Sequence, residues 1–131
     1  MVRLDEKQIK GLPIHDSDLE EISSIQKDDG NVDLSIKIKL SADCLKEFQE
    51  YEIGQGNEVL LVRFLLKNCW WIDLHQFGNT TKKDEVDYVE VIANSPKLKE
   101  LKIKKSVLHI VMHFITGSRL DVISEEVWLE K

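Results

Sequence analysis

Residues 28–40 read DDGNVDLSIKIKL, and this stretch decides the fold class. It begins with Asp-Asp-Gly-Asn, which is typical of a tight turn because Gly and Asn tolerate positive φ angles. Apolar residues then alternate strictly with polar ones over residues 32–40, which predicts a β-strand with one buried and one solvated face. A tight turn before a strand usually closes a hairpin, so residues 19–27 are predicted to be the partner strand. The three-residue spacing of apolar side chains in that segment leaves a short helix as the alternative.

The rest of the chain continues the β pattern. Residues 58–66 are apolar on both faces, which favours a central strand covered on two sides. Lys67-Asn68 is predicted to be a turn, and residues 69–77 are predicted to be a second hairpin arm. Further strands are predicted at 86–92, 106–115, 119–123 and 126–130. Short helices or irregular segments are predicted at 41–52 and 97–105, a polar loop at 78–85 and a hairpin turn at 116–118. Residues 1–14 are predicted to be a lead-in, in which Gly11 and Pro13 break any helix.

These elements predict a single domain over residues 1–131 that is mainly β, with α+β as an alternative. Turn signals recur about every ten residues, as they do in antiparallel sandwiches and half-barrels. We therefore expect about six to eight strands and one or two short helices.

Composition limits the classes of function. Acidic residues outnumber basic ones 24 to 18, which gives a net charge of −6. This balance argues against a nucleic-acid partner, because phosphate contacts need clustered Lys and Arg, and it suits a basic protein partner. No apolar run reaches the roughly 18 residues that a membrane span needs, and the first ten residues are too polar for a signal peptide. We therefore expect a cytoplasmic protein with no membrane partner and no cofactor.

The histidines are candidates for metal ligands and for catalytic groups. His109 and His113 are four residues apart, but on a strand this spacing separates them by about 13 Å, too far to share one metal. His15, Asp16 and Ser17 are the residue types of a serine hydrolase, yet adjacent residues cannot converge on one line of hydrogen bonds. His15 and Asp16 remain a candidate polar site.

The two cysteines, Cys44 and Cys69, predict neither a disulfide framework nor a zinc site. Their separation of 25 positions matches neither a disulfide pattern nor a zinc-ligand pair. Nothing in the sequence places either thiol beside a histidine as a nucleophile pair.

Aromatic and acidic residues form a candidate partner-binding set. Trp70 and Trp71 are adjacent in a predicted strand, so they should point to opposite faces, and one should be exposed or covered by a loop. Exposed Trp residues are typical anchors of protein interfaces. Asp84, Glu85 and Asp87 form an acidic patch beside the predicted polar loop.

Two terminal segments carry a resemblance. Residues 11–19 read GLPIHDSDL, and residues 114–130 read FITGSRLDVISEEVWLE. An HD-S/A-x-L/I segment before the first strand, and a G-x-L-D-I hairpin before a final V-x-L-E strand, are similar to small β-rich bacterial proteins, some of which resemble immunity proteins of toxin systems. The resemblance implies a non-enzymatic, acidic, protein-binding β domain and identifies no site residue.

The leading hypothesis is therefore a non-enzymatic protein-binding module, of immunity or antitoxin type, that neutralises a basic partner. The alternative is a small-molecule-binding β domain or an enzyme, in which His15, His75, His109 and His113 would converge in one pocket. A third hypothesis is a homo-oligomeric structural protein, because apolar strands can pair at sheet edges.

Overall fold

The computed structural model describes residues 1–45, 47, 61–75 and 84–130. The predicted hairpin is confirmed: strand β2 (Asp18–Gln26) pairs antiparallel with β3 (Val32–Lys39). Its turn is closed by the hydrogen bond from Lys27 N to Asn31 O at 2.8 Å, and Gly30 supplies the positive φ of 85°. The Asn31 backbone N–H also donates to the Asp29 carboxylate, which lowers the pKa of that carboxyl group.

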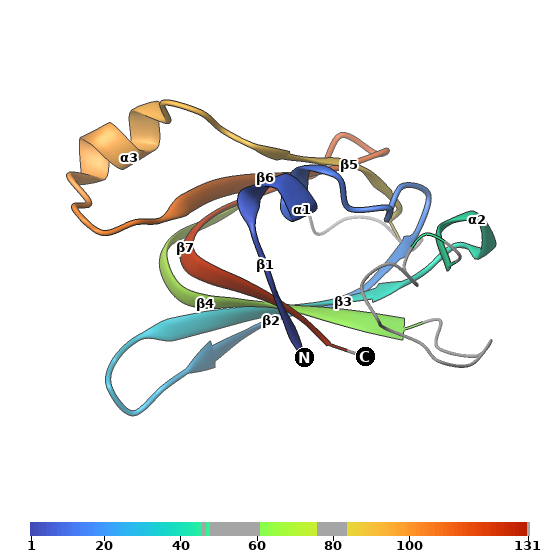
Figure 1. Cartoon of the computed structure of the whole chain (residues 1–131), viewed down its shortest axis with the longest axis horizontal. Helices are drawn as coiled ribbons and strands as arrows, with labels where there is room; N and C mark the ends of the chain where they lie inside the picture. Colours follow the sequence, from blue (N-terminus) through green and yellow to red (C-terminus); the bar gives the residue numbers. More distant parts are fainter. Residues whose placement is uncertain (46, 48–60, 76–83, 131) are drawn as a thin grey trace.

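In the described residues, seven antiparallel strands form one sheet, in the order β2-β3-β4-β7-β6-β5. β1 pairs with residues 127–129 of β7, beyond the part that pairs with β6. In Figure 1 the long strands β4 and β7 bend, so that β5 and β6 lie over β2 and β3. The sheet does not close into a barrel, and the prediction of a mainly β antiparallel fold, a sandwich or half-barrel of six to eight strands, is confirmed. The remaining strand bounds are β1 (Val2–Leu4), β4 (Leu61–His75), β5 (Val86–Val91), β6 (Leu108–Phe114) and β7 (Arg119–Glu130).

Two of the predicted strand breaks are wrong. The turn predicted at Lys67-Asn68 lies inside β4, which continues without reversing direction. Asn68 adopts a left-handed φ of 53°, and its backbone N–H donates to the Asp33 carboxylate, so a side chain of the neighbouring strand stabilises the irregularity. The two short strands predicted at 119–123 and 126–130 are the single strand β7, because β4 pairs along nearly its whole length.

The part of the chain that the structure describes contains three short helices, one more than the upper limit of the prediction. The lead-in predicted over residues 1–14 contains β1 and helix α1 (Glu6–Lys10), which ends before Gly11. Asp5 and Gln8 form a capping box that supports so short a helix. Helix α2 (Ala42–Leu45) falls in the segment predicted as 41–52, of which residues 46 and 48–52 lie outside the described part. Helix α3 is Pro96–Leu101.

The core lies on the inner face of the curved sheet. It contains alternating residues of the central strands, such as Phe64, Met112 and Val122, and α1 contributes Ile9. A small apolar cavity of about 20 Å³ remains among these side chains, between α1 and the sheet. The opposite side of β4, β6 and β7 is called the outer face below.

The two edge strands of the sheet meet at one point. Asp18 at the start of β2 forms an isolated bridge with Glu85, which directly precedes β5. Hydrogen bonds from Leu19 N to Asp84 O and from Val86 N to Ser17 O flank this bridge, each at 2.8 Å. The predicted polar loop at 78–85 therefore ends in this bridge, and its residues 78–83 lie outside the described part. No helix in the described residues is long and apolar enough to cross a membrane.

Candidate functional site

The outer face carries three histidines and their partners in cross-strand rows. Arg119 of β7 is the register partner of both His75 on β4 and His113 on β6. Asp73 and Asp121 face each other in the next row, because they follow at the same spacing along β4 and β7. Alternation along the strands places these polar side chains opposite the core residues Leu120 and Val122.

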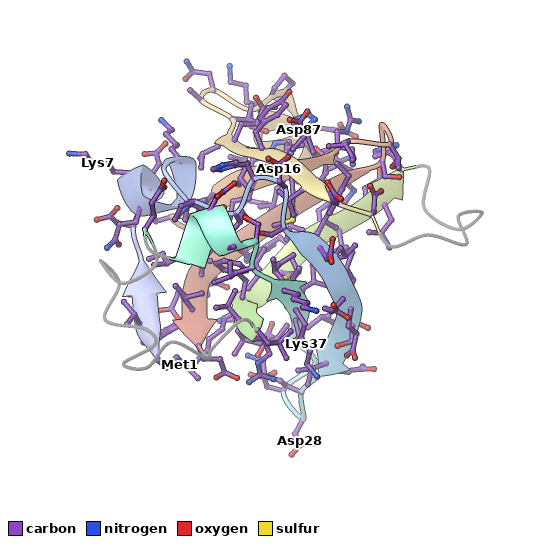
Figure 2. All side chains as sticks on the ribbon, turned by 90° about the vertical axis from the view of Figure 1, so that its right-hand side faces the viewer. Met1, Lys7, Asp16, Asp28, Lys37 and Asp87 are labelled. Carbon is purple, nitrogen blue, oxygen red and sulfur yellow. The ribbon has the colours of Figure 1, made fainter. Side chains whose placement is uncertain are left out.

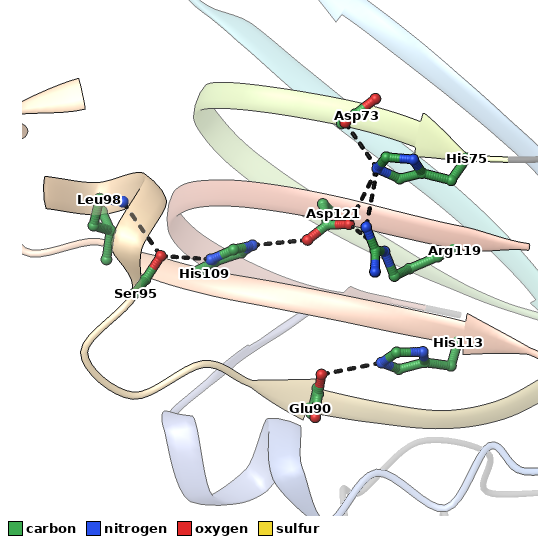
Figure 3. A network of polar contacts seen from close by, with 9 residues as sticks. All are labelled: Asp73, His75, Glu90, Ser95, Leu98, His109, His113, Arg119 and Asp121. Carbon is green, nitrogen blue, oxygen red and sulfur yellow. Dashed lines mark hydrogen bonds and ion pairs between the residues drawn. The ribbon is translucent and has the colours of Figure 1, made fainter. Parts of the chain in front are cut away.

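A buried chain of hydrogen bonds runs through His109 (Figure 3). His109 Nδ1 lies 2.7 Å from Ser95 Oγ, and His109 Nε2 lies 2.9 Å from Asp121 Oδ1. All three residues are at most 7% exposed. A neutral imidazole with its proton on Nε2 satisfies both contacts, since Ser95 then donates to Nδ1 and Nε2 donates to the carboxylate. The edge of Trp71 contacts the imidazole ring, with ring centroids 5.8 Å apart.

The Ser95–His109–Asp121 chain has the residue types of a hydrolase triad but not the access that catalysis needs. Ser95 is only 2% exposed, and its Oγ already accepts a hydrogen bond from Leu98 N as the N-cap of α3. A nucleophilic hydroxyl must be able to reach a substrate carbonyl. The capping role instead holds the Ser95 hydroxyl inside the fold. The Ser95–His109–Asp121 hydrogen bonds therefore anchor α3 to the outer face. Lys97 contributes as well, because its Nζ lies 4.9 Å above the Trp71 ring.

The network continues to the surface through Arg119. Its Nε lies 2.8 Å from Asp121 Oδ2, in an ion pair that lacks hydrogen-bond geometry, and its Nη2 lies 3.2 Å from His75 Nε2. His75 Nε2 also lies 2.8 Å from Asp73 Oδ2. His75, Arg119 and His113 line a shallow pocket of about 270 Å³.

Each basic side chain of this pocket already has a carboxylate beside it. Asp73 contacts His75, Asp121 contacts Arg119, and Glu90 Oε1 lies 3.1 Å from His113 Nε2. The pocket is thus charge-compensated by the fold itself, which disfavours an anionic ligand. Within the described residues no group of three ligating side chains has the arrangement of a metal site. His15, the fourth histidine of the ligand-binding alternative, lies apart from the other three, beside Cys44.

A second cluster forms where the sheet edges meet. Asp18 and Glu85 are a non-hydrogen-bonded pair, because the flanking bonds run from Leu19 N and Val86 N. In such pairs the Cβ atoms are at their closest, so two acidic side chains start from directly opposite positions. Asp16 N donates to Val86 O, which brings Asp16 and Asp87 to the same corner; Figure 2 shows both labelled side chains there. We call Asp16, Asp18, Glu85 and Asp87 the acidic corner.

Exposed apolar side chains border the acidic corner. The register between β5 and β6 shifts at Asp87, so this residue is a bulge, and both Asp87 and Tyr88 are exposed. Tyr88 is 49% exposed and Ile115 is 56% exposed. Ile115 N donates to Glu85 O, which fixes that side chain next to the corner.

The predicted partner-binding residues divide into separate groups. Glu85 and Asp87 belong to the acidic corner, together with Asp16 of the candidate polar site. Asp84 is 8% exposed, and its carboxylate accepts hydrogen bonds from Glu85 N and Thr116 Oγ1, so its position is structural.

The two tryptophans lie toward the other end of the outer face. Trp70 is 48% exposed and donates to Glu125, whereas Trp71 is half-buried under Lys97. Trp71 and His109 are both register partners of Ile123. The acidic corner adjoins Ile115, which directly follows β6 and is six residues beyond His109. That spacing corresponds to about 20 Å. One small contact surface therefore does not contain both groups.

Both cysteines are unpaired. The structure brings Cys44 to His15, a proximity that the sequence did not indicate, with Sγ 3.7 Å from Nδ1 and 3.9 Å from Nε2. The thiol donates instead to the His15 carbonyl oxygen at 3.1 Å and is fully buried, which is a structural arrangement. Burial and, to a smaller extent, the nearby Asp33 carboxylate together raise the pKa of the Cys69 thiol from 9.0 to about 12.

Cys69 is expected to react slowly with iodoacetamide in the folded protein. At pH 8 its thiolate fraction is about a thousandfold below that of the same thiol at its ordinary value of 9.0. Because folding raises this pKa, the neutral thiol favours the folded state below pH 9, and that contribution is lost as the pH rises toward 12. Peptide mass mapping after timed alkylation, with and without urea, measures Cys69 separately from Cys44. Equal rates in the two conditions would contradict the prediction.

In comparisons with known proteins, no family model, no curated protein and no solved structure matches this chain.

Proposed function

We propose that this chain is a non-enzymatic protein-binding module of immunity type, which neutralises a basic partner through the acidic corner. The observation that carries the proposal is the close pairing of Asp18 with Glu85. Like charges directly opposite each other destabilise a sheet, so this arrangement costs stability unless an opposite charge arrives. A lysine or arginine of a partner would supply that charge.

The surroundings of the acidic corner support a protein as the ligand. Among the ion pairs of the described residues, none involves Asp16, Asp18, Glu85 or Asp87. Tyr88 and Ile115 provide exposed apolar area beside these charges, and an aromatic anchor next to charged groups is typical of protein interfaces. The net charge of −6 would accelerate association with a basic partner. The proposal includes a cytoplasmic, reducing compartment, which agrees with two unpaired thiols.

Asp18→Asn is expected to have opposite effects on stability and on binding. Removing one of the two facing charges should raise the free energy of unfolding by about 0.2–1 kcal/mol, measured by urea denaturation. The same change should weaken capture of a basic partner, and Glu85→Gln should behave alike. Asp28→Asn is the matched control, because Asp28 is exposed at the distant hairpin turn (Figure 2).

The partner is sought by pull-down from the source cell's lysate, with low-salt and then high-salt washes. The proposal expects a basic protein that salt releases, that Asp28→Asn still captures, and that Asp18→Asn with Glu85→Gln captures much less. If the double variant captures it as well as the control does, the acidic corner is not the binding surface.

A further inference from the structure

His113 lies directly beneath the exposed aromatic of the proposed surface. The Tyr88 and His113 rings are stacked, with centroids 4.2 Å apart and planes inclined by 15°. His113 Nε2 also lies 3.1 Å from Glu90 Oε1. The histidine side chain is 22% exposed, and Tyr88 is adjacent to Asp87 of the acidic corner. One titratable ring therefore contacts both an exposed aromatic and a carboxylate at the edge of this surface.

We propose that protonation of His113 weakens the binding of basic partners at the acidic corner, so that acidification releases them. This inference rests on the proposed function. Histidine is the side chain that ordinarily changes charge between pH 5 and 8. The imidazolium would pair with Glu90, which removes one net negative charge from the neighbourhood of the corner. It would also bind the face of Tyr88 by a cation–π interaction, which holds that ring against the sheet.

The other groups around His113 do not replace it in this role. Tyr88 and Glu90 face it from β5, and Arg119 faces it from β7 as its register partner. Beyond Arg119, Asp121 and His75 form the compensated network described above. Arg119 keeps its charge at all of these pH values, and His75 is separated from Tyr88 by two strands.

The first test needs no partner. In the free protein, NMR would follow the ring resonances of Tyr88 and of the four histidines from pH 8 to pH 5. We expect the Tyr88 resonances to move with the same midpoint as His113, and to stay constant over that range in His113→Gln. Tyr88 resonances that do not follow His113, or that move unchanged in the variant, would overturn the coupling.

The second test uses fluorescent decalysine as the basic probe at low ionic strength. We expect binding to weaken by about twofold more between pH 8 and pH 5.5 in the wild type than in His113→Gln. The variant retains His15 and the carboxylates, so their titration cancels in this comparison. An equal pH response in both proteins overturns the inference and leaves the proposed function intact. If Asp18→Asn with Glu85→Gln binds decalysine as tightly as Asp28→Asn does, both the proposed function and the inference fail.

Discussion

Asp121→Ala is expected to lower the free energy of unfolding by about 1–3 kcal/mol, which is typical for leaving a buried hydrogen-bond donor without its acceptor. Asp121 is 6% exposed and contacts His109 on one oxygen and Arg119 on the other. Without it, the His109 Nε2–H has no acceptor and the Arg119 guanidinium loses its buried counter-ion. Urea denaturation monitored by tryptophan fluorescence measures the change. An unchanged m-value would show that the surface area exposed on unfolding is the same in both proteins.

Two matched variants separate this effect from a general loss of charge. Asp121→Asn retains an oxygen for His109 and should lose less stability than Asp121→Ala does. Asp73→Ala removes the carboxylate that faces Asp121 across the strands but is 40% exposed, so it should cost less than about 1 kcal/mol. If Asp121→Ala were as stable as Asp73→Ala, the Ser95–His109–Asp121 hydrogen bonds would not anchor α3 to the outer face.

Phe64→Ala should lower the free energy of unfolding by about 3–5 kcal/mol, as measured in urea. Phe64 is 2% exposed on β4, between Ile36 of β3 and Leu129 of β7. It also lines the apolar cavity of about 20 Å³ beneath α1. Removing the ring enlarges a void that already exists, and the strands on both sides limit how far the surroundings can collapse into it.

The controls for Phe64 vary volume and exposure separately. Phe64→Leu retains most of the apolar volume and should cost about 1–1.5 kcal/mol. Leu101→Ala removes an apolar side chain that is 38% exposed at the end of α3, and should change stability by no more than about 0.5 kcal/mol. A loss of under 1 kcal/mol for Phe64→Ala would contradict the assignment of the core to the inner face.

The fold was predictable wherever local pattern and tertiary structure agree. The alternation over residues 32–40 and the turn at Gly30 act within one hairpin, and β2 and β3 follow from them. The breaks predicted at Asn68 and between 123 and 126 were wrong because strand pairing overrides local signals there. The Asp33 side chain stabilises the left-handed Asn68, and β4 pairs with β7 at Ser124 and Glu126, so β7 is not interrupted there. Short helix α1 depends on the capping box of Asp5 and Gln8, a signal that was present in the sequence.

The candidate site was less predictable, because its residues meet only through the sheet. Side chains alternate along β6, so His109 and His113 lie on the face opposite Ile110 and Met112. Their partners Asp121 and Glu90 come from separate strands, and no local pattern gives that register. Asn94-Ser95-Pro96 does contain a recognisable helix start, but its hydrogen bond to His109 depends on how α3 returns over the sheet.

The position of β7 in the sheet has a consequence for the order in which the protein is made. β7 is the last strand of the chain, yet it pairs with β1, β4 and β6, and the register partners Val2 and Leu129 are almost the full chain length apart. While a ribosome still holds residues 119–130, β1 has no partner and the pairs on either side of β7 are missing. The β2–β3 hairpin can form early, but the sheet as a whole assembles only after β7 has been made. Long-range pairing of this kind slows folding, so chains truncated before residue 119 should accumulate as open, aggregation-prone fragments.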